Sequence, residues 1–187
     1  MAFSARIDTS PLARNAKRLA QLAETARERV VTRSIATMRR KLLTEARRAI
    51  SAEYGIGVQA IGNRMTAEVS PNSLSIYGTA GSLPLSWFGG KYSGRMSLGA
   101  TASVLRGETK LYRSSFIVKG RKNIVRRPMK GDKREPRRYA TMWGPGVESM
   151  FTGGGAGGRP PVVQVVGLAQ DIFSAEIDRL IEVEARN

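Results

Sequence analysis

The chain has 187 residues, with 31 Lys and Arg against 15 Asp and Glu, so its formal charge at pH 7 is +16. It contains no histidine and no cysteine, which excludes an imidazole base, a thiol nucleophile, a disulfide framework and a Cys/His zinc site. Apolar residues make up 41% of the sequence, enough for one core, so we expect a single domain over residues 1–187.

Residues 1–64 are predicted to be helical. Ser10 is a candidate N-cap, and Pro11 follows at the first helical position. Apolar residues then recur every three to four positions, with basic side chains between them. A straight helix over residues 10–53 would be about 65 Å long, so we expect it to break near Val30 or to project and pack on a neighbouring subunit. It should end at Tyr54, and residues 58–64 should add a short turn of helix.

Residues 65–147 are predicted to form a small, mostly antiparallel β-sheet. The pattern changes to period two at Met65, and Pro71-Asn72 is typical of the turn of a hairpin between residues 66–70 and 73–78. Further short strands are expected at residues 83–88, 102–105, 115–118, 124–127 and 139–143, with long polar connections and basic loops between them.

Residues 148–161 are predicted to be a Gly/Pro-rich linker. Gly153, Gly155 and Gly158 also fit the G-x-G-x-x-G spacing of a dinucleotide-binding motif. That motif needs a helix and a second strand after it, whereas Pro160-Pro161 follows directly here, so a linker or lid is the better interpretation.

Residues 162–187 are predicted to form a C-terminal amphipathic helix, because their apolar residues again have helical spacing. The predicted fold class is therefore α+β: a long N-terminal amphipathic helix, continuous or broken, and a C-terminal helix, both packed on a small, mostly antiparallel sheet.

The positive charge is concentrated between Arg113 and Arg138, where eleven Lys or Arg stand against two acids. Basic residues at this density can contact a phosphate backbone without reading its sequence, or an acidic protein partner; a solvated loop is the plain alternative. The candidate contacts with a DNA channel or an acidic partner are Lys119, Arg121, Lys122, Arg126, Arg127, Lys130, Lys133, Arg134, Arg137 and Arg138.

Two further sets of residues are candidates for a subunit interface. Aromatic side chains often supply most of the binding energy of an interface, although core packing is the alternative for one member of each pair. The last helix carries an excess of acids, in contrast to the basic middle of the chain. The interface candidates are Trp87, Phe88, Tyr139, Trp143, Asp171, Glu176, Asp178 and Glu182.

Carboxylates are the main acid/base groups left for catalysis, and their spacing does not favour it. Glu24 and Glu28 lie one helical turn apart beside arginines, which is typical of solvent-exposed ion pairs. We therefore expect no enzymatic activity, no catalytic residue, no metal site and no cofactor. No stretch offers the roughly 18 consecutive apolar residues of a membrane span, so we also expect a soluble protein without a membrane partner.

Several short elements follow one another in a recognisable order over residues 30–185. Leu83-Pro84-Leu85 comes after the hairpin, Phe116-Ile117 precedes Arg126-Arg127, and Gly144-Pro145 precedes the last helix. This order resembles the minor tail protein Z family of tailed bacteriophages, also called tail completion proteins.

The resemblance implies a structural subunit of the virion, in a neck or tail-completion/tail-terminator ring at the head–tail junction around the DNA channel. It implies a homo-oligomeric ring, expected to be a hexamer, that contacts the tail terminator, the head–tail connector, the tail tube and, transiently, genomic DNA. The chain would lie in the virion neck or upper tail, and in the host cytoplasm during assembly. Its basic middle and acidic last helix would supply the two unlike patches that a head-to-tail ring needs. The alternatives are a nucleic-acid-binding protein without sequence specificity and a minor tail protein of the tail tip or tape measure.

Overall fold

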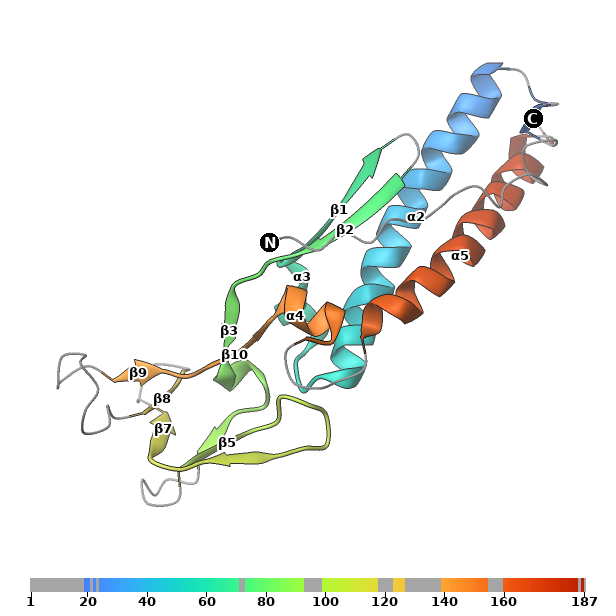
Figure 1. The fold of residues 1–187 in the computed structure, drawn as a ribbon. Helices are drawn as coiled ribbons and strands as arrows, with labels where there is room; N and C mark the ends of the chain where they lie inside the picture. The colour runs from blue at the N-terminus through green and yellow to red at the C-terminus, as the bar shows by residue number, and fades with distance from the viewer. Residues whose placement is uncertain are drawn as a thin grey trace.

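The structure, a computed structural model, describes residues 19–20, 22, 24–70, 73–92, 99–117, 123–126, 139–154, 160–184 and 186. The molecule is elongated: two long helices lie side by side in one half, and short antiparallel strands fill the other half (Figure 1). The predicted α+β class is confirmed. The expectation of one sheet is wrong, because the described strands form four small antiparallel sheets of two or three strands each.

Helix α2 (Glu24–Glu53) is continuous through Val30, so of the two expected alternatives the break there is wrong. Val30 is buried, so packing outweighs the lower helix propensity of a β-branched residue. The helix is about 45 Å long, and helix α5 (Pro161–Glu184) runs antiparallel beside it (Figure 1). The length of α2 is therefore accommodated inside the chain, by α5. The predicted helical residues 10–18 lie outside the described part.

The two helices meet through buried ridges in which every fourth residue is turned inward. Small side chains in these ridges favour a close approach of the two helices. The α2 ridge is formed by Val30, Ser34, Met38, Leu42, Ala46 and Ile50, and the α5 ridge by Pro161, Val165, Ala169, Phe173, Ile177 and Ile181.

The predicted hairpin is confirmed and lies along α2. Helix α3 (Val58–Gly62) leads into β1 (Met65–Ser70), which pairs antiparallel with β2 (Ser73–Gly78). Ala67 and Ile76 are cross-strand partners in this pair, and both are buried. The hairpin thus covers a second side of α2 with its apolar face.

The remaining strands form three sheets at the other end of the molecule. They are β3 (Ser82–Pro84) with β10 (Trp143–Gly146); β4 (Lys91–Tyr92), β5 (Ala100–Ala102) and β6 (Lys110–Tyr112); and β7 (Ser115–Ile117), β8 (Ile124–Arg126) and β9 (Ala140–Thr141). The predicted strands at residues 115–118 and 124–127 are confirmed in their described residues, β7 and β8.

Four of the predicted segments need correction. The strand expected at residues 83–88 ends at Pro84, because the chain turns into a 3₁₀ helix, η2 (Leu85–Trp87), that Phe88 N–H closes onto the Leu85 carbonyl. The strand expected at residues 102–105 ends at Ala102, and the one expected at residues 139–143 divides into β9 and β10. The predicted linker begins as helix α4 (Val147–Thr152), which ends at Gly153 with φ of +78°.

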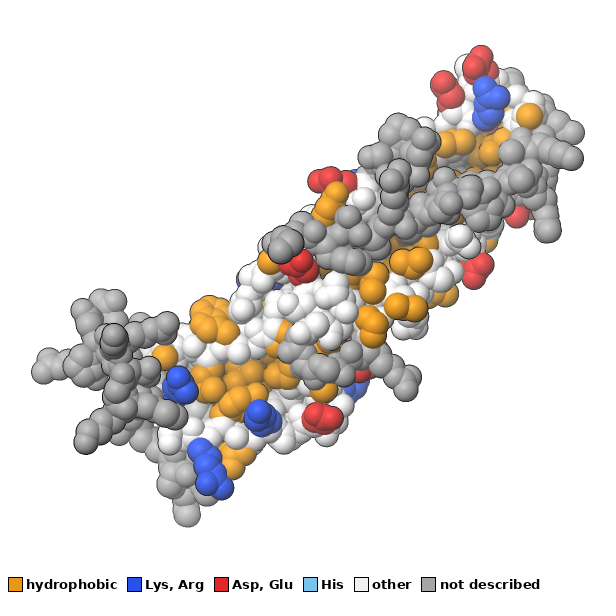
Figure 2. Space-filling view, viewed as in Figure 1, with side chains coloured by type: hydrophobic (Ala, Val, Ile, Leu, Met, Phe, Trp, Pro, Cys, Tyr) orange, Lys and Arg blue, Asp and Glu red, His pale blue; other side chains and the backbone are white. Residues whose placement is uncertain are grey.

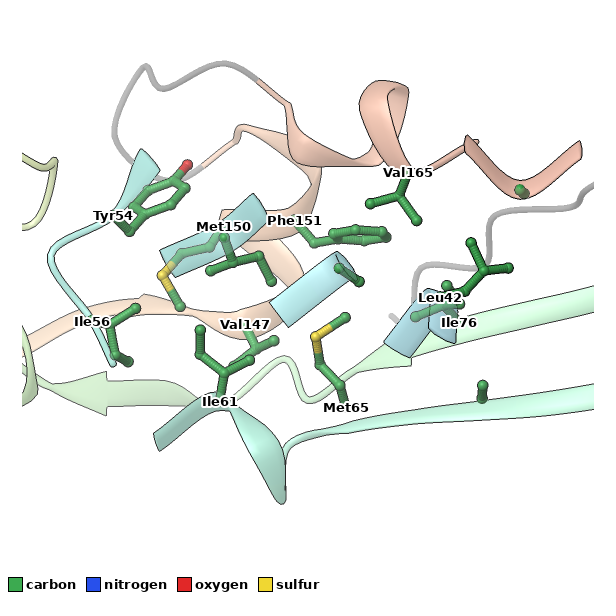
Figure 3. Packing of buried hydrophobic residues seen from close by; sticks show 14 of the residues in the cluster. Leu42, Tyr54, Ile56, Ile61, Met65, Ile76, Val147, Met150, Phe151 and Val165 are labelled. Carbon is green, nitrogen blue, oxygen red and sulfur yellow. The ribbon is translucent and has the colours of Figure 1, made fainter. Parts of the chain in front are cut away.

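The two halves join at the C-terminal end of α2. Tyr54 forms an isolated bridge with Leu105, and the Arg106 guanidinium donates to the Ser51 carbonyl at 2.7 Å. The Arg106 N–H also donates to the Glu53 carbonyl at 2.9 Å, so Arg106 satisfies two carbonyls that the helix end leaves open. Beneath this junction lies a shared core, which includes Ile56, Ile61, Met65, Val147, Met150 and Phe151 (Figure 3).

Gly55 permits the close backbone contact at this junction. Its N–H donates to the Val104 carbonyl at 3.0 Å, and a Cβ added at residue 55 would overlap the Ser103 carbonyl oxygen. The backbone of residues 103–106 can approach α2 only because this side chain is missing.

We predict that Gly55→Ala lowers the free energy of unfolding by about 1 to 3 kcal/mol, because the junction must open to admit a methyl group. Gly62→Ala is the matched control, since a Cβ there meets nothing within 4 Å. Chemical denaturation of both variants measures the difference, and equal stability of the two would contradict this role for Gly55.

Candidate functional site

The predicted basic contact set lies almost wholly outside the described residues. Arg126 is described; it lies in β8, half-buried, and is paired in register with Ser115 and Ala140. The other nine, Lys119, Arg121, Lys122, Arg127, Lys130, Lys133, Arg134, Arg137 and Arg138, are outside the described part. The described β-rich half exposes further cations: Lys91, Arg106, Lys110 and Arg113.

The predicted interface aromatics divide into three exposed residues and one core residue. Trp143 is 59% exposed, Tyr139 52% and Trp87 37%. Tyr139 stacks edge-to-face on Phe116 at 5.0 Å, and the Arg64 guanidinium lies 5.4 Å from the Trp87 ring. Phe88 is fully buried, and a Cβ at Gly144 would come within 2.6 Å of its ring. Phe88 therefore serves the core of the chain and is not available to an interface.

A cleft of about 820 Å³ adjoins Trp143, between the β3–β10 sheet and the segment that leads into β6. We call it the aromatic cleft; among its lining residues are Leu85, Leu105, Glu108, Lys110, Tyr112 and Trp143. Burial raises the pKa of the Tyr112 hydroxyl, so Tyr112 is a neutral donor and acceptor at physiological pH. Figure 2 shows hydrophobic side chains gathered in this half of the molecule, with Lys and Arg beside them.

Sequence reasoning missed the aromatic cleft as a cavity, although it singled out Trp143. The lining residues extend from Ala80 to Ser149 and come from separate short strands and loops. Such a combination leaves no periodic signal in the sequence. The available clues were the Gly-Pro-Gly sequence after Trp143 and the low number of aromatic residues, only 6% of the chain.

The predicted acidic residues of α5 have unlike surroundings. Asp171 and Glu182 are exposed and Asp178 is half-buried, whereas Glu176 is only 3% exposed. The Glu176 carboxylate accepts from Lys41 Nζ of α2 at 3.2 Å and from Arg179 at 2.6 Å. The structure thus uses Glu176 inside the chain, between its two long helices, which differs from the predicted subunit contact.

The hydrogen bond from Arg179 is the main influence on the Glu176 carboxyl, and it lowers the pKa of that group below its ordinary value of 4.5. Burial acts in the opposite direction, and the hydrogen bond from Lys41 lowers the pKa further. The carboxylate is therefore ionised at neutral pH, although it is buried beside the apolar ridge of α5.

Two more arginines of α2 lie near an acid of α5. Arg29 and Arg33 are 4.0 and 3.8 Å from the Glu184 carboxylate, and both arginine side chains are exposed. The cations of α2 are thus partly balanced along one edge of the helix pair.

A second, shallower groove of about 620 Å³ lies between α2 and α5. Leu168 and Ile172 of α5 supply its apolar wall, and Arg40, Lys41 and Arg48 of α2 line its other side, with Glu45 among them. Within the described residues, no group of three or more acidic side chains could hold a metal ion. The described helices also include none that is long and apolar enough to cross a bilayer.

Comparison of the chain with family models, with curated proteins and with solved structures found no match in any of the three. The similarity to tail completion proteins remains a prediction from the order of sequence elements.

We predict that Glu176→Gln lowers the free energy of unfolding by about 1 to 3 kcal/mol at neutral pH, because it weakens two charge-assisted hydrogen bonds. Glu182→Gln removes an exposed acid from the same helix and should stay within about 0.5 kcal/mol of the parent. Chemical denaturation of the three proteins measures both effects.

The contribution of Glu176 to the free energy of unfolding should depend on pH. Because folding lowers the pKa of Glu176, its stabilisation is complete above pH 4.5 and disappears as pH falls through the lowered value of the folded state. The stability difference between the parent and Glu176→Gln should therefore shrink on acidification. A difference that grows below pH 4.5 would contradict this assignment.

Proposed function

We propose that this chain is a structural, non-enzymatic subunit of a tailed-phage virion: a component of a neck or tail-completion ring at the head–tail junction, around the DNA channel. The proposal begins from the order of sequence elements that resembles the tail completion family. The structural observation that best supports it is the pair of unlike surfaces on one elongated molecule, the aromatic cleft in one half and the charged helix pair in the other.

Unlike surfaces are what a ring subunit requires. Each copy in a head-to-tail ring contacts its neighbours through two different patches, and it must also contact the components above and below the ring. Trp143 and Tyr139 are more than half exposed, and aromatic residues of this kind are typical anchors of protein interfaces. We therefore assign the aromatic cleft to contacts with neighbouring virion proteins, the tail terminator, the connector or the tail tube.

The exposed cations of the β-rich half support a position near DNA. Lys91, Arg106, Lys110 and Arg113 are exposed there, with Glu108 as an acid among them. Contacts of this type neutralise phosphates without reading bases, as a channel for passing DNA requires. The same observation favours a second candidate function, a free nucleic-acid-binding protein. Such a protein would be monomeric and would bind duplex DNA with a steep dependence on salt.

The location is tested by immunogold electron microscopy of purified virions of the phage that encodes the chain. We expect label at the head–tail junction, and particles that carry none of the chain would overturn the proposal. A monomeric protein that binds duplex DNA tightly in low salt, and is missing from particles, would support the second candidate.

We predict that Trp143→Ser reduces incorporation of the chain into particles about 30-fold, the effect of losing an interface anchor worth about 2 kcal/mol. Its melting temperature should not change, because the side chain is 59% exposed. Val58→Ser is the control, since Val58 is 39% exposed on α3 and does not line the aromatic cleft. Normal incorporation of Trp143→Ser would remove the aromatic cleft from the assembly interface.

A further inference from the structure

The helix pair carries a basic face on α2 and an acidic face on α5. On α2, residues at positions i, i+4, i+7 and i+11 lie on one face of the helix: Arg29, Arg33, Ala36 and Arg40, all exposed. On α5 the same spacing holds for Asp171, Ala175, Asp178 and Glu182, exposed except for the half-buried Asp178. Each face therefore has three charges of one sign and one alanine.

The two faces match when they are laid antiparallel. Arg40 then lies opposite Asp171, Ala36 opposite Ala175, Arg33 opposite Asp178 and Arg29 opposite Glu182, since the intervals of four, three and four residues coincide. One step further, Thr44 would face Gly167, again two small residues. In the parallel arrangement Arg33 would face an alanine and Ala36 an aspartate. The faces are thus complementary in charge and in size in one direction only.

Inside the chain, the alanines at the centre of the two faces do not pack against each other, because both are exposed. Inside the chain, α2 and α5 already pack through their buried ridges, to which Leu42 of α2 and Ala169 of α5 belong. Ala36 and Ala175 are exposed, on the sides of their helices that this packing leaves open. The partner that offers a face of matching spacing and opposite charge is a second copy of the same chain.

We propose that the basic face of α2 in one copy binds the acidic face of α5 in a second copy, antiparallel and in the register that pairs Arg40 with Asp171. Each copy then uses each face once, so the contact is head-to-tail and repeats around a ring. This inference rests on the proposed ring function, and it names the surfaces that join the subunits. The alanine pair lets the helices approach to the usual 8 to 10 Å or so.

The character of this contact follows from its exposure. Pairs of exposed charges add modest affinity and mainly set partner, direction and register. Arg29 and Arg33 also lie close to Glu184 of their own chain, and Asp178 has an interaction within its own chain as well, so Arg40 and Asp171 form the most independent pair. We therefore expect an association that weakens with rising salt and that ring closure reinforces.

Charge reversal of the purified full-length chain tests the register. Arg40→Asp and Asp171→Arg should each raise the dissociation constant of the contact about tenfold, because an attraction becomes a repulsion. An equimolar mixture of the two variants should assemble again. In the mixture, the reversed charge at position 40 of one variant meets the reversed charge at position 171 of the other. Sedimentation velocity and native mass spectrometry measure the assemblies.

Two further variants separate charge from shape. Arg39→Asp makes the same charge change at an exposed neighbour outside the face, and it should assemble like the parent. Ala175→Trp keeps every charge but blocks the close approach, so it should prevent assembly while circular dichroism and melting temperature stay unchanged.

The outcomes distinguish this contact from the wider function. The contact is wrong if the parent assembles but the mixture of the two variants does not. It is also wrong if Arg39→Asp weakens assembly as much as Arg40→Asp. In both cases, immunogold label at the head–tail junction would still support the ring function. A parent chain that stays monomeric at high concentration also overturns the contact. Absence of the chain from virions, by contrast, overturns the proposed function.

Discussion

The packing of α2 against α5 is the contact on which the rest of the structure depends. The helix has 30 residues, and its eight Lys and Arg side chains repel one another. It therefore needs a packing partner to stabilise it over this length. The α5 ridge offers it an apolar surface over most of its length, and Glu176 and Glu184 place negative charge beside its cations. Small residues such as Ser34, Ala46 and Ala169 alternate in the two buried ridges with larger ones such as Met38 and Phe173, which favours close packing of the helices.

The β-rich half is organised around the end of this helix pair. Short strands of two to four residues cannot build a large sheet, and each small sheet is stable only where it lies on a core that other elements supply. Ile56, Ile61 and Met65 bring the end of α2 and the start of the hairpin into that core, and α4 closes it with Met150 and Phe151 (Figure 3). Arg106 and the Tyr54–Leu105 bridge then fix its position on the helix end.

This arrangement divides the charges of the chain between internal and external roles. Glu176 is buried in the folded chain, where it forms ion pairs with Lys41 and Arg179. Asp171 and Glu182 of the same helix stay on the surface. Acids on different faces of one amphipathic helix thus serve stability in one case and are exposed for recognition in the other. The exposed aromatic residues of the β-rich half add a second surface of different chemistry.

The sequence by itself determined the elements whose signals are local. Helical spacing located α2 and α5, alternation and a Pro-Asn turn located the hairpin, and the lack of His and Cys limited the chemistry. Only the tertiary structure decided that α2 continues through Val30, that Leu85 begins a 3₁₀ turn, and that Phe88 and Glu176 are buried while Trp143 is exposed. The physical reason is that burial depends on which distant segment covers a residue. Glu176 is buried because α2, more than a hundred residues earlier, supplies Lys41, and no pattern around position 176 records that pairing.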